Sequence, residues 1–154
     1  MGQALYELKY RQDRKRVRPI AQAVVEFVQS KTELADVCAV IAVPPSDIGR
    51  TFQPVPALAA AIGAGLALDV PKDYLVKTKK TSPVKDVSDV SDRQEELRGA
   101  FQVVDERFRD RHVLLFDDLF RSGGTLTSVS TALYEQGKVG KVSVVTATMT
   151  RSKR

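Results

Sequence analysis

The stretch Val113–Thr125 reads V-L-L-F-D-D-L-F-R-S-G-G-T, and the rest of the chain is best interpreted outward from it. Its first four residues are apolar, and a short apolar run of this kind is typical of a strand that is buried on both faces of a sheet. Two adjacent carboxylates, Asp117 and Asp118, follow the run, and a double glycine comes next at Gly123 and Gly124. The stretch therefore predicts a buried strand that ends at the two acids and leads through a glycine loop into a helix.

The segments on both sides of this stretch alternate between strand-like and helix-like patterns. Short apolar runs predict strands, and apolar residues at helical spacing predict helices. Because strands that alternate with helices imply right-handed crossovers, we expect an α/β fold with a mainly parallel central sheet flanked by helices. The predicted strands are residues 36–43, 74–77, 101–104, 112–116 and 142–148, and the predicted helices are residues 17–28, 53–68 and 126–135.

The length and composition indicate one soluble globular domain, residues 1–154. The chain is 43% hydrophobic and 28% charged, which is the composition of a folded and not of a disordered protein. No apolar run approaches the ~20 residues needed to cross a bilayer, so we expect no membrane insertion and a cytoplasmic location. The single cysteine, Cys38, excludes an internal disulfide and a cysteine-based zinc site.

The basic residues are unevenly placed along the chain. The formal net charge of +5 comes from 24 basic and 19 acidic residues. A basic cluster near the start could attract nucleic acid, including single-stranded DNA, or a phosphorylated ligand, and the alternative is a solvated basic face. No helix-turn-helix, zinc-finger or RNA-recognition signature accompanies the cluster. Its members are Lys9, Arg11, Arg14, Lys15, Arg16 and Arg18.

The two acids and the glycine loop together suit a sugar phosphate. Buried carboxylates need partners, and vicinal ribose hydroxyls can each donate a charge-assisted hydrogen bond to an ionised carboxylate. Glycines let successive backbone amides point at one anion, and a helix N-terminus adds unpaired amides and a favourable dipole. Ser122 and Thr125 add hydroxyl donors, and Arg121 adds positive charge. The spacing between the acids and the loop matches ribose 5-phosphate.

An ordinary strand-to-helix turn, in which Thr125 only caps the helix, is the alternative interpretation. That interpretation does not explain why two carboxylates and a double glycine occur together. The chain contains no G-x-x-x-x-G-K-[ST] and no G-x-G-x-x-G, which argues against a P-loop and against a dinucleotide-binding fingerprint.

The stretch Val113–Thr125 resembles the phosphoribosyl pyrophosphate motif of type I phosphoribosyltransferases, and within that superfamily the chain is most similar to the ComF-type proteins associated with competence and DNA uptake. Where the commoner loop has two threonines, this chain has Arg121 and Ser122, and the cysteine-rich zinc module of many ComF-type proteins is absent. The flanking segments that carry the resemblance are Leu8-Lys9-Tyr10-Arg11, Val43-Pro44-Pro45-Ser46 with Arg50, Phe52 and Gln53, and Arg98-Gly99-Ala100-Phe101.

The resemblance implies an enzyme that binds phosphoribosyl pyrophosphate and Mg²⁺ and transfers the phosphoribosyl group to or from a nitrogenous base. The alternative is a non-catalytic module that binds a phosphoribosyl group or a nucleotide and acts in DNA uptake, single-stranded DNA handling or regulation. A homodimer and a flexible loop at about residues 78–99, which begins beside Lys77, Lys79 and Lys80, are also implied.

The resemblance also implies roles for individual residues. Asp118 and Lys77 are expected to take part in catalysis, and Asp117 and Asp118 are expected to hold Mg²⁺ through the ligand or through water. The expected phosphoribosyl-binding residues are Asp117, Asp118, Leu119, Phe120, Arg121, Ser122, Gly123, Gly124 and Thr125, and the expected pyrophosphate-binding residues are Pro45, Ser46, Asp47 and Arg50.

Overall fold

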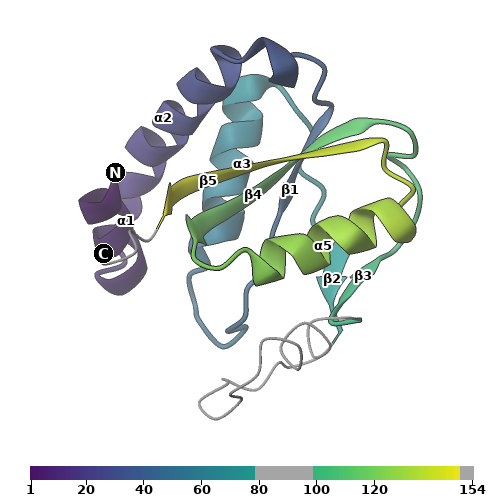
Figure 1. Cartoon of the computed structure of the whole chain (residues 1–154). Helices are drawn as coiled ribbons and strands as arrows, with labels where there is room; N and C mark the ends of the chain where they lie inside the picture. Colours follow the sequence, from purple (N-terminus) through teal and green to yellow (C-terminus); the bar gives the residue numbers. More distant parts are fainter. Residues whose placement is uncertain (79–98, 150–154) are drawn as a thin grey trace.

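The computed structural model of this chain describes residues 1–78 and 99–149. Its centre is a parallel sheet in the order β1-β4-β5, formed by β1 (Ala39–Ala42), β4 (His112–Phe120) and β5 (Lys141–Met149) (Figure 1). The central strand, β4, carries the two acids and leads into the glycine loop. The predicted α/β fold class with a parallel central sheet is confirmed.

Helices cover both faces of this sheet. They are α2 (Val17–Gln29), α3 (Pro54–Leu66) and α5 (Gly124–Glu135). Figure 1 shows α2 and α3 on one face and α5 on the other. Val40, Leu114 and Phe116 pack toward α2 and α3, whereas the intervening Ile41 and Leu115 pack toward α5. This alternation explains why both inner strands are continuous apolar runs in the sequence.

A second, smaller sheet lies beside α5. The strands β2 (Leu75–Lys77) and β3 (Phe101–Val103) pair with each other in antiparallel fashion and do not join the main sheet. Both strands were predicted, but their direction departs from the parallel arrangement of the main sheet. The pair places Lys77 at one end of β2, directly opposite Phe101.

Strand β4 is longer than the sequence predicts. The prediction ended it at residue 116, but its pairing with β5 continues through Asp117 with Thr146 and Leu119 with Thr148. The two acids therefore lie inside the last part of the strand and not after it, which corrects the sequence interpretation. The physical reason is the length of β5, which supplies backbone partners as far as Met149.

One helix was missed altogether, namely α1 (Gly2–Tyr10). Its buried residues are only Leu5 and Leu8, which is too few to produce a clear helical period in the sequence. Two single turns of 3₁₀ helix, Arg14–Arg16 and Thr32–Leu34, also went unpredicted.

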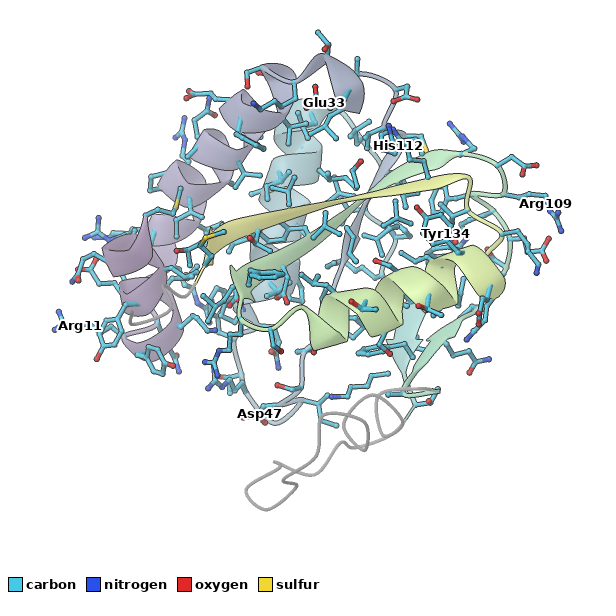
Figure 2. The ribbon with its side chains drawn as sticks, in the orientation of Figure 1. Arg11, Glu33, Asp47, Arg109, His112 and Tyr134 are labelled. Carbon is cyan, nitrogen blue, oxygen red and sulfur yellow. The ribbon has the colours of Figure 1, made fainter. Side chains whose placement is uncertain are left out.

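The far end of β4 is fastened by a buried histidine. His112 is 5% exposed, and its Nδ1 lies 2.6 Å from Asp36 Oδ1 while its Nε2 lies 2.8 Å from Ser143 Oγ. Figure 2 shows His112 at the opposite end of the molecule from Asp47, which belongs to the loop between β1 and α3. The histidine therefore joins segments at the end of the sheet that is remote from the two acids.

Most of the loop predicted at about residues 78–99, including Lys79 and Lys80, falls outside the described residues. Within the described ranges, every helix is too short or too polar to span a membrane.

Candidate functional site

A pocket of about 510 Å³ opens at the carboxyl ends of β1 and β4. Ligands of parallel α/β sheets bind at this end of the strands. The pocket collects every residue that the sequence assigned to the site except Phe120, whose ring lies against Gly123. The predicted residues on its walls are Pro45, Ser46, Asp47, Arg50, Lys77, Asp117, Asp118, Leu119, Arg121, Ser122, Gly123, Gly124 and Thr125.

The two adjacent acids have different surroundings. The Asp118 side chain is 9% exposed, and its Oδ2 lies 2.8 Å from the ammonium nitrogen of Lys9. Among the described residues, the Asp117 carboxylate forms no ion pair, and it accepts the backbone amide of Asp118 at 2.8 Å. Burial raises the pKa of Asp117 to about 6, although the hydrogen bond from that amide opposes the shift. The pair is thus one charge-balanced carboxylate beside one that binds a proton unusually readily.

The start of α5 has no side-chain cap. Gly123, which precedes the helix, has a φ of +76° and provides no side-chain cap. The first amide to donate along the helix is that of Thr127, which bonds to the carbonyl of Gly123 at 2.8 Å. The amides of the first turn therefore have no intrahelical acceptor. Thr125 lies inside the helix and makes no cap, since Gly123 is the N-cap residue, and ligand binding at this turn stays a prediction.

The loop after β1 is shaped by Asp47 and Gln53. Asp47 Oδ1 accepts the amide of Gly49 at 3.0 Å, and its Oδ2 lies 3.4 Å from Nε of Arg50. Gln53 donates from Nε2 to the carbonyl oxygens of Asp47 at 2.7 Å and Arg50 at 3.3 Å. Ser46, Asp47 and Arg50 all line the pocket, and the Asp47 carboxylate and the Arg50 guanidinium lie against each other within the loop.

Sequence reasoning missed two pocket residues on α1. Neither Lys9 nor Tyr10 was assigned to the site, yet both line the pocket. Tyr10 is 61% exposed, and its ring centroid lies 4.9 Å from that of Tyr6. The resemblance of Leu8-Lys9-Tyr10-Arg11 was the one available signal. It did not indicate that α1 lies against the end of β4.

The carboxylates of the pocket suit Mg²⁺ only if a bound ligand supplies further oxygen atoms. Within residues 1–78 and 99–149, no three histidine, cysteine, aspartate or glutamate side chains gather in a way that could hold a metal. Mg²⁺ is commonly held by one or two carboxylates together with substrate phosphates and water. Asp117 and Asp118 fit that mode of binding, since both line the pocket beside the start of α5.

Comparisons with known proteins bear on the fold. No protein-family model matches the sequence, and no curated protein matches it. Among solved structures, the glutamine phosphoribosylpyrophosphate (PRPP) amidotransferase from B. subtilis, complexed with ADP and GMP, aligns with 86% of this chain at 16% identity and a TM-score of 0.57. The adenine phosphoribosyltransferase from Leishmania tarentolae aligns with 88% of it at 12% identity and a TM-score of 0.55. A hypoxanthine phosphoribosyltransferase from Staphylococcus aureus aligns with 90% of it at 10% identity and a TM-score of 0.51.

The chain has the fold of the type I phosphoribosyltransferases. It spans 26% of the amidotransferase and 58% of the adenine enzyme, so it corresponds to only part of each. The fold that the resemblance implies is thus confirmed, while membership of the superfamily and the finer similarity to ComF-type proteins stay predictions. Because one fold can carry many activities, the activity has to come from the chemistry of the pocket.

Proposed function

We propose that this protein binds phosphoribosyl pyrophosphate in the pocket and transfers its phosphoribosyl group to or from a nitrogenous base. The observation that carries the proposal is the pocket itself, in which three different features meet. These are the acid pair at the end of β4, the uncapped start of α5 and the loop that presents Ser46 and Arg50. The ligand has hydroxyls, a phosphate and a diphosphate, and each feature suits one of these groups.

Each part of the ligand would meet a different wall. The 5′-phosphate would lie at the start of α5, where first-turn amides and the Arg121 guanidinium attract an anion. The diphosphate would lie beside Ser46 and Arg50, and the ribose hydroxyls would donate to the Asp118 carboxylate. Lys77 lines the same pocket, and its ammonium would offset the negative charge that grows on the departing diphosphate.

The transfer exchanges one bond at the anomeric carbon. The bond between C1′ and a diphosphate oxygen breaks, and diphosphate leaves with the bonding electrons. A nitrogen lone pair of the acceptor forms the new bond to C1′, and the proton that this nitrogen loses passes to solvent. The chemistry needs no covalent protein nucleophile, so the pocket residues would act by positioning and by stabilising charge. Mg²⁺ held through the ligand or water by Asp117 and Asp118 would supply further neutralisation of the diphosphate.

The direct test is a calorimetric titration with phosphoribosyl pyrophosphate, with and without Mg²⁺, followed by assays of diphosphate release against purine and pyrimidine bases. We expect binding that strengthens with Mg²⁺ and diphosphate release that depends on one of the bases. Absence of binding under both conditions would contradict the proposal. Binding without turnover would instead favour the non-catalytic module.

Tyr10 is the aromatic residue of the pocket wall best placed to contact a planar acceptor. Its ring is exposed and is braced by Tyr6. Since stacking of a base on an aromatic ring contributes about 1–3 kcal/mol, Tyr10→Ala should raise the KM for the acceptor by about tenfold. Tyr10→Phe, the matched control, should leave it nearly unchanged, and neither variant should alter the affinity for phosphoribosyl pyrophosphate. An unaltered acceptor KM in Tyr10→Ala would remove Tyr10 from the acceptor site.

A second candidate function, binding of single-stranded DNA, is favoured by the surface of α1 and the turn after it. Tyr6 and Tyr10 are 52% and 61% exposed, and exposed basic residues follow them in the chain. Aromatic rings beside positive charge are typical of single-strand binding surfaces. Arg16 of the basic cluster is less suitable for replacement, because its guanidinium is paired with Glu7 at 2.6 Å. The exposed members are Arg11, Arg14, Lys15 and Arg18, and Arg14 lies over the Phe52 ring, 4.9 Å from its centroid.

Combined replacement of Arg11, Lys15 and Arg18 by alanine should weaken binding of a single-stranded oligonucleotide about tenfold at low salt and flatten its salt dependence. Fluorescence anisotropy over a salt series measures both quantities. Arg109→Ala is the control, since Figure 2 shows Arg109 on the opposite side of the molecule from Arg11. Lack of any oligonucleotide binding by the unaltered protein at low salt would discard this candidate.

The homodimer and the cytoplasmic location stay predictions.

A further inference from the structure

The C-terminal end of α1 is held firmly against the pocket. Leu5 and Leu8 of this helix are 4% and 0% exposed and belong to the core between α2, α3 and the sheet. The ion pair between Glu7 and Arg16 adds a second attachment on the same helix. Figure 1 shows α1 next to the end of β5, on the side of the sheet where β4 also ends. The next residue, Lys9, is therefore positioned at the site by a helix that is packed against the core.

Lys9 makes its contact with the more deeply buried of the two acids. Its Nζ lies 2.8 Å from Asp118 Oδ2, and the two side chains are 21% and 9% exposed. A carboxylate this enclosed is unfavourable unless a cation or hydrogen-bond donors accompany it. Among the described residues, Lys9 is the only cation that forms an ion pair with Asp118, since the nearby Arg50 pairs with Asp47 instead. The ion pair is made through Oδ2, so Oδ1 is the carboxylate oxygen that Lys9 does not hold.

We propose that Lys9 is a positioning residue for the sugar: it holds the Asp118 carboxylate in one orientation so that Oδ1 accepts a ribose hydroxyl. This inference rests on the proposed function, because it assumes that the pocket receives a ribose phosphate. It adds a preference for ribose over deoxyribose to that function. If the Asp118 oxygen is held in place to accept a hydroxyl, a sugar without that hydroxyl leaves the oxygen unpaired and binds more weakly.

A purely structural role for the ion pair leads to a different expectation. If Lys9 only fastened α1 to β4, its loss would lower stability and would affect ribose and deoxyribose ligands equally. If Lys9 orients Asp118, its loss would weaken the ribose ligand more than the deoxyribose ligand. The ratio of the two affinities therefore separates the two roles in a way that stability alone does not.

The experiment is calorimetric titration with ribose 5-phosphate, 2-deoxyribose 5-phosphate and inorganic phosphate. The unaltered protein should bind ribose 5-phosphate about tenfold more tightly than the deoxy sugar, as expected for a hydrogen bond to a charged group. In Lys9→Met this ratio should fall to near one, while the affinity for inorganic phosphate stays the same. Lys9→Arg should restore most of the ratio. Lys72→Met, at an exposed lysine outside the pocket, is the matched control and should behave like the unaltered protein.

Each outcome bears on the proposal. A Lys9→Met protein that keeps the ratio of the unaltered protein overturns the positioning role and leaves the proposed function standing. An unaltered protein that binds phosphoribosyl pyrophosphate without discriminating between the two sugars also overturns the positioning role. An unaltered protein that binds neither sugar phosphate nor phosphoribosyl pyrophosphate overturns both. If Lys9→Met fails to fold, the same comparison can be made with Lys9→Gln, whose side chain keeps a hydrogen-bond donor but has no charge.

Discussion

Replacement of Gly123 by valine is expected to reduce the affinity for phosphoribosyl pyrophosphate by about 100-fold or more, the effect of losing several hydrogen bonds to a charged group. Gly123 adopts a φ of +76°, a conformation that a β-branched residue rarely adopts. A Cβ built at this position would lie 3.2 Å from Cε2 of Phe120. The Phe120 ring would have to give way slightly, and relief of the strain at this positive φ would shift the backbone and the first-turn amides of α5.

Calorimetry measures this loss, and a second glycine provides the control. Gly99 has a φ of +77°, so Gly99→Val introduces a similar backbone strain, but Gly99 does not line the pocket. We expect Gly99→Val to lower the melting temperature without changing the affinity of the folded protein. If Gly123→Val bound the ligand as tightly as the unaltered protein, the loop before α5 would not be the phosphate site.

The part of the site that could be predicted from residue spacing alone is local in the chain, whereas Lys77 and the loop after β1 were assigned through the family resemblance. The strand, the acids, the glycines and the helix all lie within Val113–Thr125, so residue spacing alone was enough to predict their order. The predicted end of β4 was wrong because that end depends on pairing with β5, about thirty residues later. The α/β class was predicted for a related reason, since the alternation of strands and helices is visible along the chain.

The part that could not be predicted depends on contacts between distant segments. Lys9 reaches Asp118 only because Leu5 and Leu8 anchor α1 in the core, and nothing in the sequence around Lys9 indicates that contact. The same limit applies to His112, whose partners Asp36 and Ser143 lie on other segments. The sequence around a charged or polar residue does not indicate which distant residue it will contact. Such contacts are seen only in the folded structure.

Asparagine at the two neighbouring acids should change stability in opposite directions. Burial raises the pKa of Asp117 from 3.8 to about 6, so ionisation of this group favours the unfolded state. Its unfavourable contribution is absent below about pH 4, develops as the pH rises toward 6 and is fully present above that. Asp117→Asn removes it and should raise the free energy of unfolding by about 1–2 kcal/mol at pH 8, after allowance for partial exposure to solvent.

Asp118→Asn should instead lower the free energy of unfolding by about 1–2 kcal/mol at pH 8, because it leaves the ammonium of Lys9 without its carboxylate. Urea unfolding at pH 4 and pH 8 measures both variants. At pH 4 the gain from Asp117→Asn should largely disappear, since the native Asp117 is then mostly protonated and neutral in the fold. If Asp117→Asn instead lowered the free energy of unfolding at pH 8, the ionised Asp117 carboxylate would have a stabilising partner in the fold. The proposed difference between the two acids, one that readily binds a proton and one that is balanced by Lys9, would then be wrong.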